Sequence, residues 1–170
     1  MTVDLRGERV VLRRPRPEDA AELLRQHLTP EVFRWWGRPD DDFPWYDDPH
    51  TTYLAIVVDD TPAGWIQFYE EPEADYRHAS IDLFVDPAHH RRGVASDAIR
   101  TVMGHLADDR GHHRITIDPC VANVAAVACY EGVGFRPVGV LHAAWRSPDG
   151  SWLDDLLMEW VAPRFRAAAR

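Results

Sequence analysis

The chain has 170 residues, a formal net charge of −9 and 45% hydrophobic residues, which fits one globular domain with its own core. This acidity argues against a nucleic-acid or anionic-membrane binder, because phosphate contacts need clustered cations, and it favours a cationic partner. Neither a signal peptide nor an apolar run of membrane-spanning length is present, so we expect a cytoplasmic protein. Two cysteines and two adjacent histidine pairs lack the spacing of a disulfide framework or metal site, so no metal is predicted.

Strand and helix patterns alternate along the chain. The first half predicts a strand, two helices, a hairpin and a further strand, at 8–14, 17–28, 30–37, 51–58 with 65–70, and 76–85. The second half predicts a helix starting near Gly93, a strand, a second helix and a final hairpin, the last three at 113–118, 123–131 and 136–145 with 152–160. We therefore predict a single α/β (α+β) domain over residues 1–163, with a mixed sheet of six or seven strands, flanking helices and a C-terminal tail at 164–170.

The segment 86–95 connects an alternating apolar strand to an amphipathic helix. It carries Arg91 and Arg92 followed by the small residues Gly93 and Ala95. Helix N-terminal N–H groups and guanidinium groups both bind phosphate, so the segment predicts a pyrophosphate site. A basic turn that caps an ordinary surface helix has the same composition, and this alternative stays open.

Acidic runs at 40–42, 47–48 and 70–75 are interleaved with large aromatic residues, among them Trp35, Trp36 and Tyr69. Such a combination predicts a cleft that stacks against and neutralises a cationic amine. Solvated surface charge is the alternative.

Two motifs carry a resemblance over nearly the whole chain: Arg91-Arg92-Gly93-Val94-Ala95 after a strand, and the run 123–135, Asn-Val-Ala-Ala-Val-Ala-Cys-Tyr-Glu-Gly-Val-Gly-Phe. The chain resembles the GCN5-related N-acetyltransferase (GNAT) superfamily, whose members move an acetyl group from acetyl-CoA to an amine. The first motif departs from the usual pattern, with His90 in the leading position and Ala95 in the last. The resemblance implies a GNAT domain over 1–163, with a splay between the fourth and fifth strands.

A narrower resemblance is to aminoglycoside 6′-N-acetyltransferases. It is carried by the segments Trp35-Trp36-Gly37, Ile81-Asp82, 117–123 and Cys129-Tyr130-Glu131, although the stretch from Tyr69 to Asp82 is shorter than in some of these enzymes. It implies acetylation of a cationic small-molecule amine, the 6′-amine of an aminoglycoside, and hence antibiotic resistance. A lysine-derived siderophore precursor, a protein N-terminus or a non-catalytic CoA-binding sensor are the alternatives.

Three residues receive catalytic roles. Asp82 lies at the polar phase of its strand and is expected to hold the substrate ammonium and relay its proton, whereas Asp118 binds another ammonium or accepts a proton. The resemblance makes Tyr130 the acid that protonates the leaving sulfur. An exposed strand aspartate, an Asp-Pro strand end and a core tyrosine are the respective structural alternatives.

The remaining assignments follow from the same resemblance. Acetyl-CoA contacts are expected from Phe84, Val85, Arg91, Arg92, Gly93, Val94, Ala95, Ser96, Asn123 and Tyr130. Substrate contacts are expected from Trp35, Trp36, Tyr69, Glu71, Asp82 and Asp118. A strand bulge near Phe84 or Val85 would direct a backbone N–H at the thioester carbonyl. The exposed edges of the C-terminal hairpin are compatible with a monomer or a homodimer.

Overall fold

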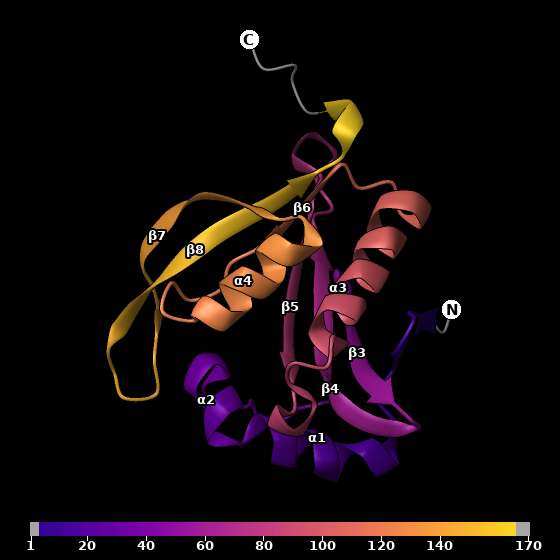
Figure 1. Ribbon diagram of the computed structural model, residues 1–170, viewed down its shortest axis with the longest axis vertical. Helices are drawn as coiled ribbons and strands as arrows, with labels where there is room; N and C mark the ends of the chain where they lie inside the picture. Colours follow the sequence, from indigo (N-terminus) through magenta and orange to yellow (C-terminus); the bar gives the residue numbers. More distant parts are fainter. Residues whose placement is uncertain (1–3, 166–170) are drawn as a thin grey trace.

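A computed structural model describes residues 4–165 as one eight-stranded mixed sheet with helices on both faces (Figure 1). The strand order is β1-β2-β3-β4-β5-β6-β8-β7, with only β5 and β6 parallel. The strands are β1 (Leu5–Arg6), β2 (Val11–Arg13), β3 (Thr51–Val58), β4 (Thr61–Glu70), β5 (Ala79–Val85), β6 (Arg114–Ile117), β7 (Arg136–Arg146) and β8 (Trp152–Val161). The additional strand is β1, whose two residues are too few to show alternation. The α/β class and the mixed sheet are confirmed.

Four α-helices complete the fold: α1 (Ala20–His27), α2 (Pro30–Trp36), α3 (Val94–Gly104) and α4 (Val124–Val133). Short helical turns occupy Pro17–Asp19, Ala74–Tyr76, Pro87–His89, His105–Asp109 and Pro163–Phe165. Across residues 4–165, none of the helices combines the length and hydropathy of a membrane span.

Several predicted boundaries were wrong. The first strand begins at Val11 and not at residue 8, and β4 begins at Thr61 and not at residue 65, because Thr61 already pairs with Val58 of β3. The helix expected from Pro17 opens with a 3-10 turn, a common start for a helix, and becomes α-helical at Ala20. The strand expected from Tyr76 begins at Ala79, where pairing with β4 starts, because a 3-10 turn occupies the preceding segment. The tail expected at 164–170 stays a prediction: its described residues belong to the turn Pro163–Phe165, in which the Phe165 ring packs against His113, and residues 166–170 lie outside the described part.

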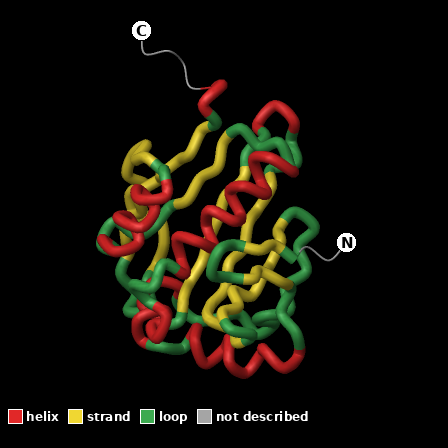
Figure 2. Tube along the Cα trace, turned by 45° about the vertical axis from the view of Figure 1, so that its right-hand side comes forward, coloured by secondary structure: helices red, strands yellow, loops and turns green. Residues whose placement is uncertain are grey.

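The sheet separates two hydrophobic cores because successive side chains of a strand point to opposite faces. In β3, Leu54 and Ile56 join the larger core under α3 and α4, whereas Ala55 and Val57 join the smaller core under α1 and α2. The tube view shows the helices on the two sides of the strands (Figure 2). β7 forms one outer edge of the sheet, and a monomer or homodimer stays a prediction.

The splay expected between the fourth and fifth predicted strands lies between β5 and β6. These strands pair only through Ala79 with Ile115 and Ser80 with Thr116, and then diverge. The bulge expected near Phe84 or Val85 is wrong, because β5 pairs with β4 in unbroken register from Ala79 to Val85. In the β3–β4 pair the register shifts instead between Ile56 and Val57, where Ala63 of β4 is the extra residue, and β7 has two further shifts against β8.

A buried carboxylate joins the start of the chain to α3. Asp97, 8% exposed, accepts hydrogen bonds from the backbone N–H groups of Glu8, Arg9 and Val10 at 3.2, 2.7 and 3.1 Å. These three donors belong to the turn between β1 and β2, so one side chain fixes the position of that turn on the helix.

We predict that Asp97→Ala lowers the free energy of unfolding by about 2–4 kcal/mol, because buried N–H groups lose their charged acceptor. Urea unfolding measures the loss. Asp108→Ala, at an exposed position on the turn after α3, is the control and is expected within about 0.5 kcal/mol of the wild type. Equal stability of Asp97→Ala and the control contradicts the structural role of this carboxylate.

Candidate active site

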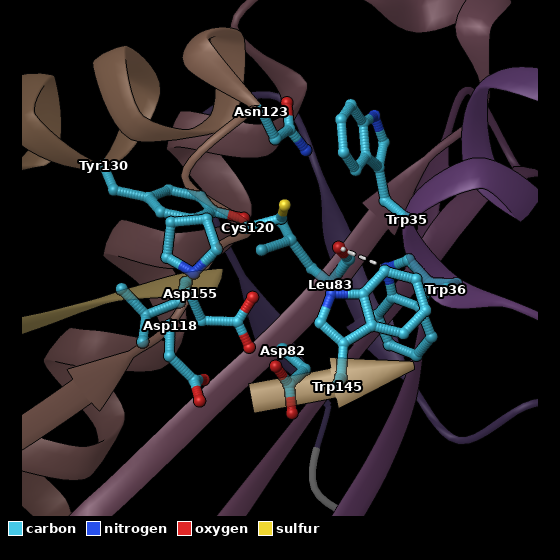
Figure 3. A pocket seen from close by; sticks show the side chains of 12 residues that line it. Trp35, Trp36, Asp82, Leu83, Asp118, Cys120, Asn123, Tyr130, Trp145 and Asp155 are labelled. Atoms are coloured by element: carbon cyan, nitrogen blue, oxygen red, sulfur yellow. Dashed lines mark hydrogen bonds between the residues drawn. The ribbon is translucent and has the colours of Figure 1, made fainter. Parts of the chain in front are cut away.

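A pocket of about 330 Å³ opens at the splay between β5 and β6 (Figure 3). Its volume lies at the lower end of the range for small-molecule sites. Twelve residues line it: Trp35, Trp36, Asp82, Leu83, Ile117, Asp118, Pro119, Cys120, Asn123, Tyr130, Trp145 and Asp155. The structure therefore brings together both predicted catalytic aspartates, Tyr130, Asn123 and the two predicted tryptophans.

Asp82 lies on β5, on the sheet face that also bears Phe84 and the α1/α2 core. Asp82 is exposed to solvent where it lines the pocket, and partial loss of hydration between the pocket walls raises its pKa to about 6. The negative charge of Asp118 contributes in the same direction, whereas Gln67, its cross-strand neighbour on β4, favours the ionised form. Asp82 is therefore suited to accept a proton near neutral pH.

Asp118 and Asp155 face the same space from the other side of the splay. Asp118 follows the last residue of β6, and burial raises its pKa. Asp155, on β8, is 8% exposed, and burial followed by repulsion from Asp118 and Asp154 raises its pKa to about 6. Figure 3 shows the three carboxylates gathered in one part of the pocket. The site is strongly acidic as a result.

Sequence reasoning missed Asp155. The pair Asp154-Asp155 interrupts a strand whose other residues are apolar except for Glu159, a pattern that could have marked it. Its approach to Asp118 depends on the pairing of β8 with the segment after β6, where Leu156 N–H donates to Pro119 O at 2.8 Å and Val121 N–H donates to Asp154 O at 2.9 Å.

Tyr130 projects from α4 toward the pocket, which it lines together with Cys120 (Figure 3). Its pKa is raised above the usual value by burial and by the negative groups around it, including Asp82 and Asp118. Asn123 caps α4, since its side-chain oxygen accepts from Ala126 N–H at 3.3 Å. Tyr130 thus keeps its proton over the physiological pH range.

Aromatic side chains form the wall of the pocket on the α2 side. Trp36 donates its indole N–H to the Leu83 carbonyl at 3.2 Å, and its ring meets Phe84 edge to face at 5.3 Å (Figure 3). Trp36 also borders a second pocket of about 250 Å³, which Gln67 and Asp40 help to line. Aromatic and acidic groups therefore continue beyond the first pocket.

Two residues predicted to contact the substrate, Tyr69 and Glu71, line neither pocket. Tyr69, near the end of β4, donates its hydroxyl to Glu71 at 3.2 Å. Tyr69 is on the same sheet face as Gln67 and is displaced along the strand from Asp82.

Alternation along β5 decides which backbone groups face the splay. Asp86 N–H bonds to Ala63 O at 2.8 Å, so Phe84, two residues earlier, also directs its main-chain groups toward β4. The carbonyls of Leu83 and Val85 instead accept from Trp36 and from His90, the latter at 2.9 Å. Of the two residues predicted to direct a backbone N–H at the thioester carbonyl, Val85 has main-chain groups that face the splay and Phe84 does not.

The predicted phosphate loop leads into α3 through two residues with positive φ, Arg91 at 60° and Gly93 at 79°. Gly93 is the N-cap, so the free N–H groups of the first helical turn face the loop, where Arg91 and Arg92 are exposed. The side chain of Val94 is buried in the core, so only its backbone N–H can contribute to ligand binding. The Ser96 hydroxyl lies 3.4 Å from Cys129 Sγ. The donors and charges here fit a pyrophosphate.

Arg9 is a further cation at this loop that the sequence did not indicate. A Cβ atom on Gly93 would lie only 3.5 Å from Arg9 Nε, so the side chain of Arg9 reaches the N-terminus of α3. The bonds between Asp97 and the β1–β2 turn hold it there.

The splayed mixed sheet, the anion-binding turn before α3 and the polar pocket at the splay together define the class of the protein. The acetyltransferase (GNAT) family matches residues 20–135, so the chain belongs to this family. Members of the family use acetyl-CoA. The predicted resemblance is thereby confirmed.

Individual relatives agree with this membership. The chain is 26% identical over 166 residues to aminoglycoside N(6′)-acetyltransferase type 1 of Klebsiella pneumoniae, covering 85% of this chain and 80% of the relative. A solved structure of aminoglycoside acetyltransferase AAC(6′)-Ib with coenzyme A and kanamycin matches with a TM-score of 0.73 and 23% identity, covering 93% of this chain and 99% of that one.

Other curated matches are partial. The chain is 32% identical over 115 residues to mycothiol acetyltransferase of Salinispora arenicola, with 62% of this chain and 36% of the relative covered. For the first three curated relatives, the chain spans between 25% and 36% of their length.

Among the described residues, no group of three potential ligand side chains is placed to hold a metal ion.

We predict that Arg9→Ala weakens the binding of coenzyme A about five- to tenfold, because one guanidinium group near the phosphates is lost. Isothermal titration calorimetry with coenzyme A measures the affinity. Arg6→Ala, which removes an exposed arginine from the same end of the chain, is the control and keeps wild-type affinity. Unchanged affinity in Arg9→Ala excludes this contact.

Proposed function

We propose that the protein is an N-acetyltransferase that moves the acetyl group of acetyl-CoA directly to a primary amine of a cationic small molecule, namely the 6′-amine of an aminoglycoside. One observation carries the proposal: an acidic pocket that contains Asp82 and Tyr130 opens at the splay. The class of reaction rests on family membership, whereas the aminoglycoside rests on the acidic pocket and on the relative from Klebsiella pneumoniae.

Bound acetyl-CoA would supply the activated acetyl thioester. Arg91, Arg92 and the N-terminal N–H groups of α3 would hold the pyrophosphate at the loop described above. The main chain of Val85 faces the splay, so its N–H is placed to donate to the thioester carbonyl and stabilise the negative charge that develops there.

The amine enters as an ammonium ion, which the carboxylates of the pocket attract. Asp82 holds this ammonium and accepts its proton, since its pKa of about 6 keeps it ionised at neutral pH and makes it a stronger base than an ordinary aspartate. Asp118 adds negative charge beside it. The neutral amine then attacks the thioester without a covalent enzyme intermediate.

The departing thiolate requires a proton. Tyr130 keeps its hydroxyl proton because burial raises its pKa, and its side chain lies in the same pocket as Asp82. It would donate this proton to the sulfur as the carbon–sulfur bond breaks, giving free coenzyme A, and it would regain a proton from the nitrogen, which loses one as the amide forms.

Release of free thiol from acetyl-CoA tests the proposal. The panel contains 6′-amino and 6′-hydroxy aminoglycosides together with lysine, polyamines and short peptides. The chain contains no lysine, so acetylation of its own ε-amino groups cannot contribute. Release restricted to 6′-amino compounds supports the assignment. Thiol release with lysine or peptides alone would show that the acceptor is not an aminoglycoside. Binding of acetyl-CoA without thiol release for any amine would indicate a non-catalytic sensor and not an enzyme.

We predict that Asp82→Asn reduces turnover at least tenfold, an order of magnitude expected for loss of a general base. In the wild type, kcat/KM rises with pH through about 6, where Asp82 loses its proton. The carboxylates of the pocket interact with one another, so the rise of kcat/KM near pH 6 reports on the group and not on one residue. Asp82→Asn is expected to shift this rise or to remove it. Unchanged turnover with an unchanged rise excludes Asp82 as the base.

We predict that Tyr130→Phe lowers kcat about tenfold or more with little change in the affinity for acetyl-CoA, because the ring is kept and only the proton donor is lost. Steady-state kinetics and calorimetry separate the two effects. Phe135, whose ring lies 6.4 Å from Tyr130, offers a packing control through Phe135→Leu. A loss of stability without a loss of kcat in Tyr130→Phe assigns the tyrosine to the core alone.

A further inference from the structure

Asp155 has an environment that the fold alone does not explain. Its side chain is more than nine-tenths buried, it lines the pocket, and its Oδ1 atom has no hydrogen-bond partner among the described residues. A buried carboxylate oxygen without a donor costs free energy, so the site is incomplete without a positively charged or donating ligand.

The backbone holds Asp155 rigidly at this position. Asp155 forms an isolated antiparallel bridge with Cys120, and hydrogen bonds on either side join Leu156 to Pro119 and Val121 to Asp154. This pairing fixes the backbone of Asp155 and directs its Cβ atom to the face of the sheet that bears the pocket.

The charged groups around Asp155 repel it and do not compensate it. Asp118 and Asp154 are its negative neighbours, and Asp155 in turn acts on Asp82. Among the ion pairs of residues 4–165, none includes Asp82, Asp118 or Asp155. The neutral groups nearby are Tyr130 and Cys120. Three carboxylates thus share one pocket without a cation from the described part of the chain.

One ammonium ion cannot balance this charge. An ammonium held by Asp82 leaves Asp118 and Asp155 on the opposite side of the splay, and a second ammonium of the same molecule would compensate the negative charge of these two carboxylates. We propose that Asp155, together with Asp118, forms a subsite for a second ammonium group of the substrate, so that the enzyme selects diamines and polyamines over monoamines.

The proposed function enters this proposal only where the bound diamine is taken to be the substrate. The subsite itself can therefore be tested by a binding measurement that needs no turnover. The probes are 1,4-diaminobutane and n-butylamine, which share a carbon chain and differ by one ammonium group. Calorimetric competition at pH 7.5 and constant ionic strength gives the ratio of their affinities for the whole protein.

The wild type is expected to bind the diamine at least about tenfold more tightly than the monoamine. Asp155→Asn is expected to bring this ratio close to one, because the diamine loses more affinity than n-butylamine does. The matched control Asp154→Asn removes the adjacent carboxylate, which faces the other way and contacts His142 and Ala143, and it keeps the wild-type ratio.

A stability measurement separates binding from a structural role. The pKa of Asp155 is about 6 in the fold and near 3.9 in an unfolded chain, so its ionisation destabilises the folded state as pH rises through this range. Asp155→Asn should therefore have a higher urea midpoint than the wild type at pH 8, and this gain should shrink at pH 4. A lower midpoint at pH 8 assigns Asp155 to the fold and overturns the subsite.

The outcomes also separate this proposal from acetyl transfer. A wild type without diamine preference, or an Asp155→Asn variant that retains it, overturns the subsite even when thiol release is observed. A diamine preference that depends on Asp155 supports the subsite even when every amine fails to release thiol, and in that case acetyl transfer to such amines is what fails.

Discussion

The functional region depends on a sheet that is left unfinished between two parallel strands. β5 and β6 share only two residue pairs, and beyond Ser80 each strand has an edge that the other does not cover. Backbone groups that would otherwise complete a ladder are satisfied by side chains, as when Trp36 donates to Leu83 and His90 contacts Val85. The opening thus creates the pocket and also provides main-chain groups for a ligand.

Around this opening, stability is given up for charge. Asp155 is buried, whereas Asp82 and Asp118 are exposed where they line the pocket, and no arginine of the described residues is paired with any of the three. Elsewhere the fold compensates buried carboxylates carefully: Asp97 has three backbone donors and Asp19 pairs with Arg13. The contrast identifies the pocket as the part of the molecule whose electrostatics require a partner.

The sequence was sufficient for features encoded by local pattern. Alternation in β5 placed Asp82 on the face away from the larger core, and the glycine-containing turn before α3 was recognised from residue types alone. Asp155 and Arg9 were missed because their positions depend on contacts between distant segments. β8 inserts between β6 and β7, and Asp97 joins the β1–β2 turn to α3, 88 residues away in the case of Arg9.

The expected bulge shows that a family resemblance can also imply a backbone feature that this chain does not have. A family resemblance implied an irregular β5, yet β5 is regular and the nearby irregularity is at Ala63 of β4, in its pairing with β3. The backbone orientation needed at the splay is produced by simple alternation along an antiparallel pair, so Val85 faces the opening without any distortion of its strand.

The raised pKa values of Asp82 and Asp155 also couple ligand capture to the proton content of the solution. Near pH 6 a fraction of these carboxyl groups is protonated, and a cation that enters must displace those protons into the buffer. The measured heat of binding will therefore vary with the ionisation enthalpy of the buffer. The affinity of the empty pocket for cations will weaken in acidic surroundings, even though the shape of the pocket is the same.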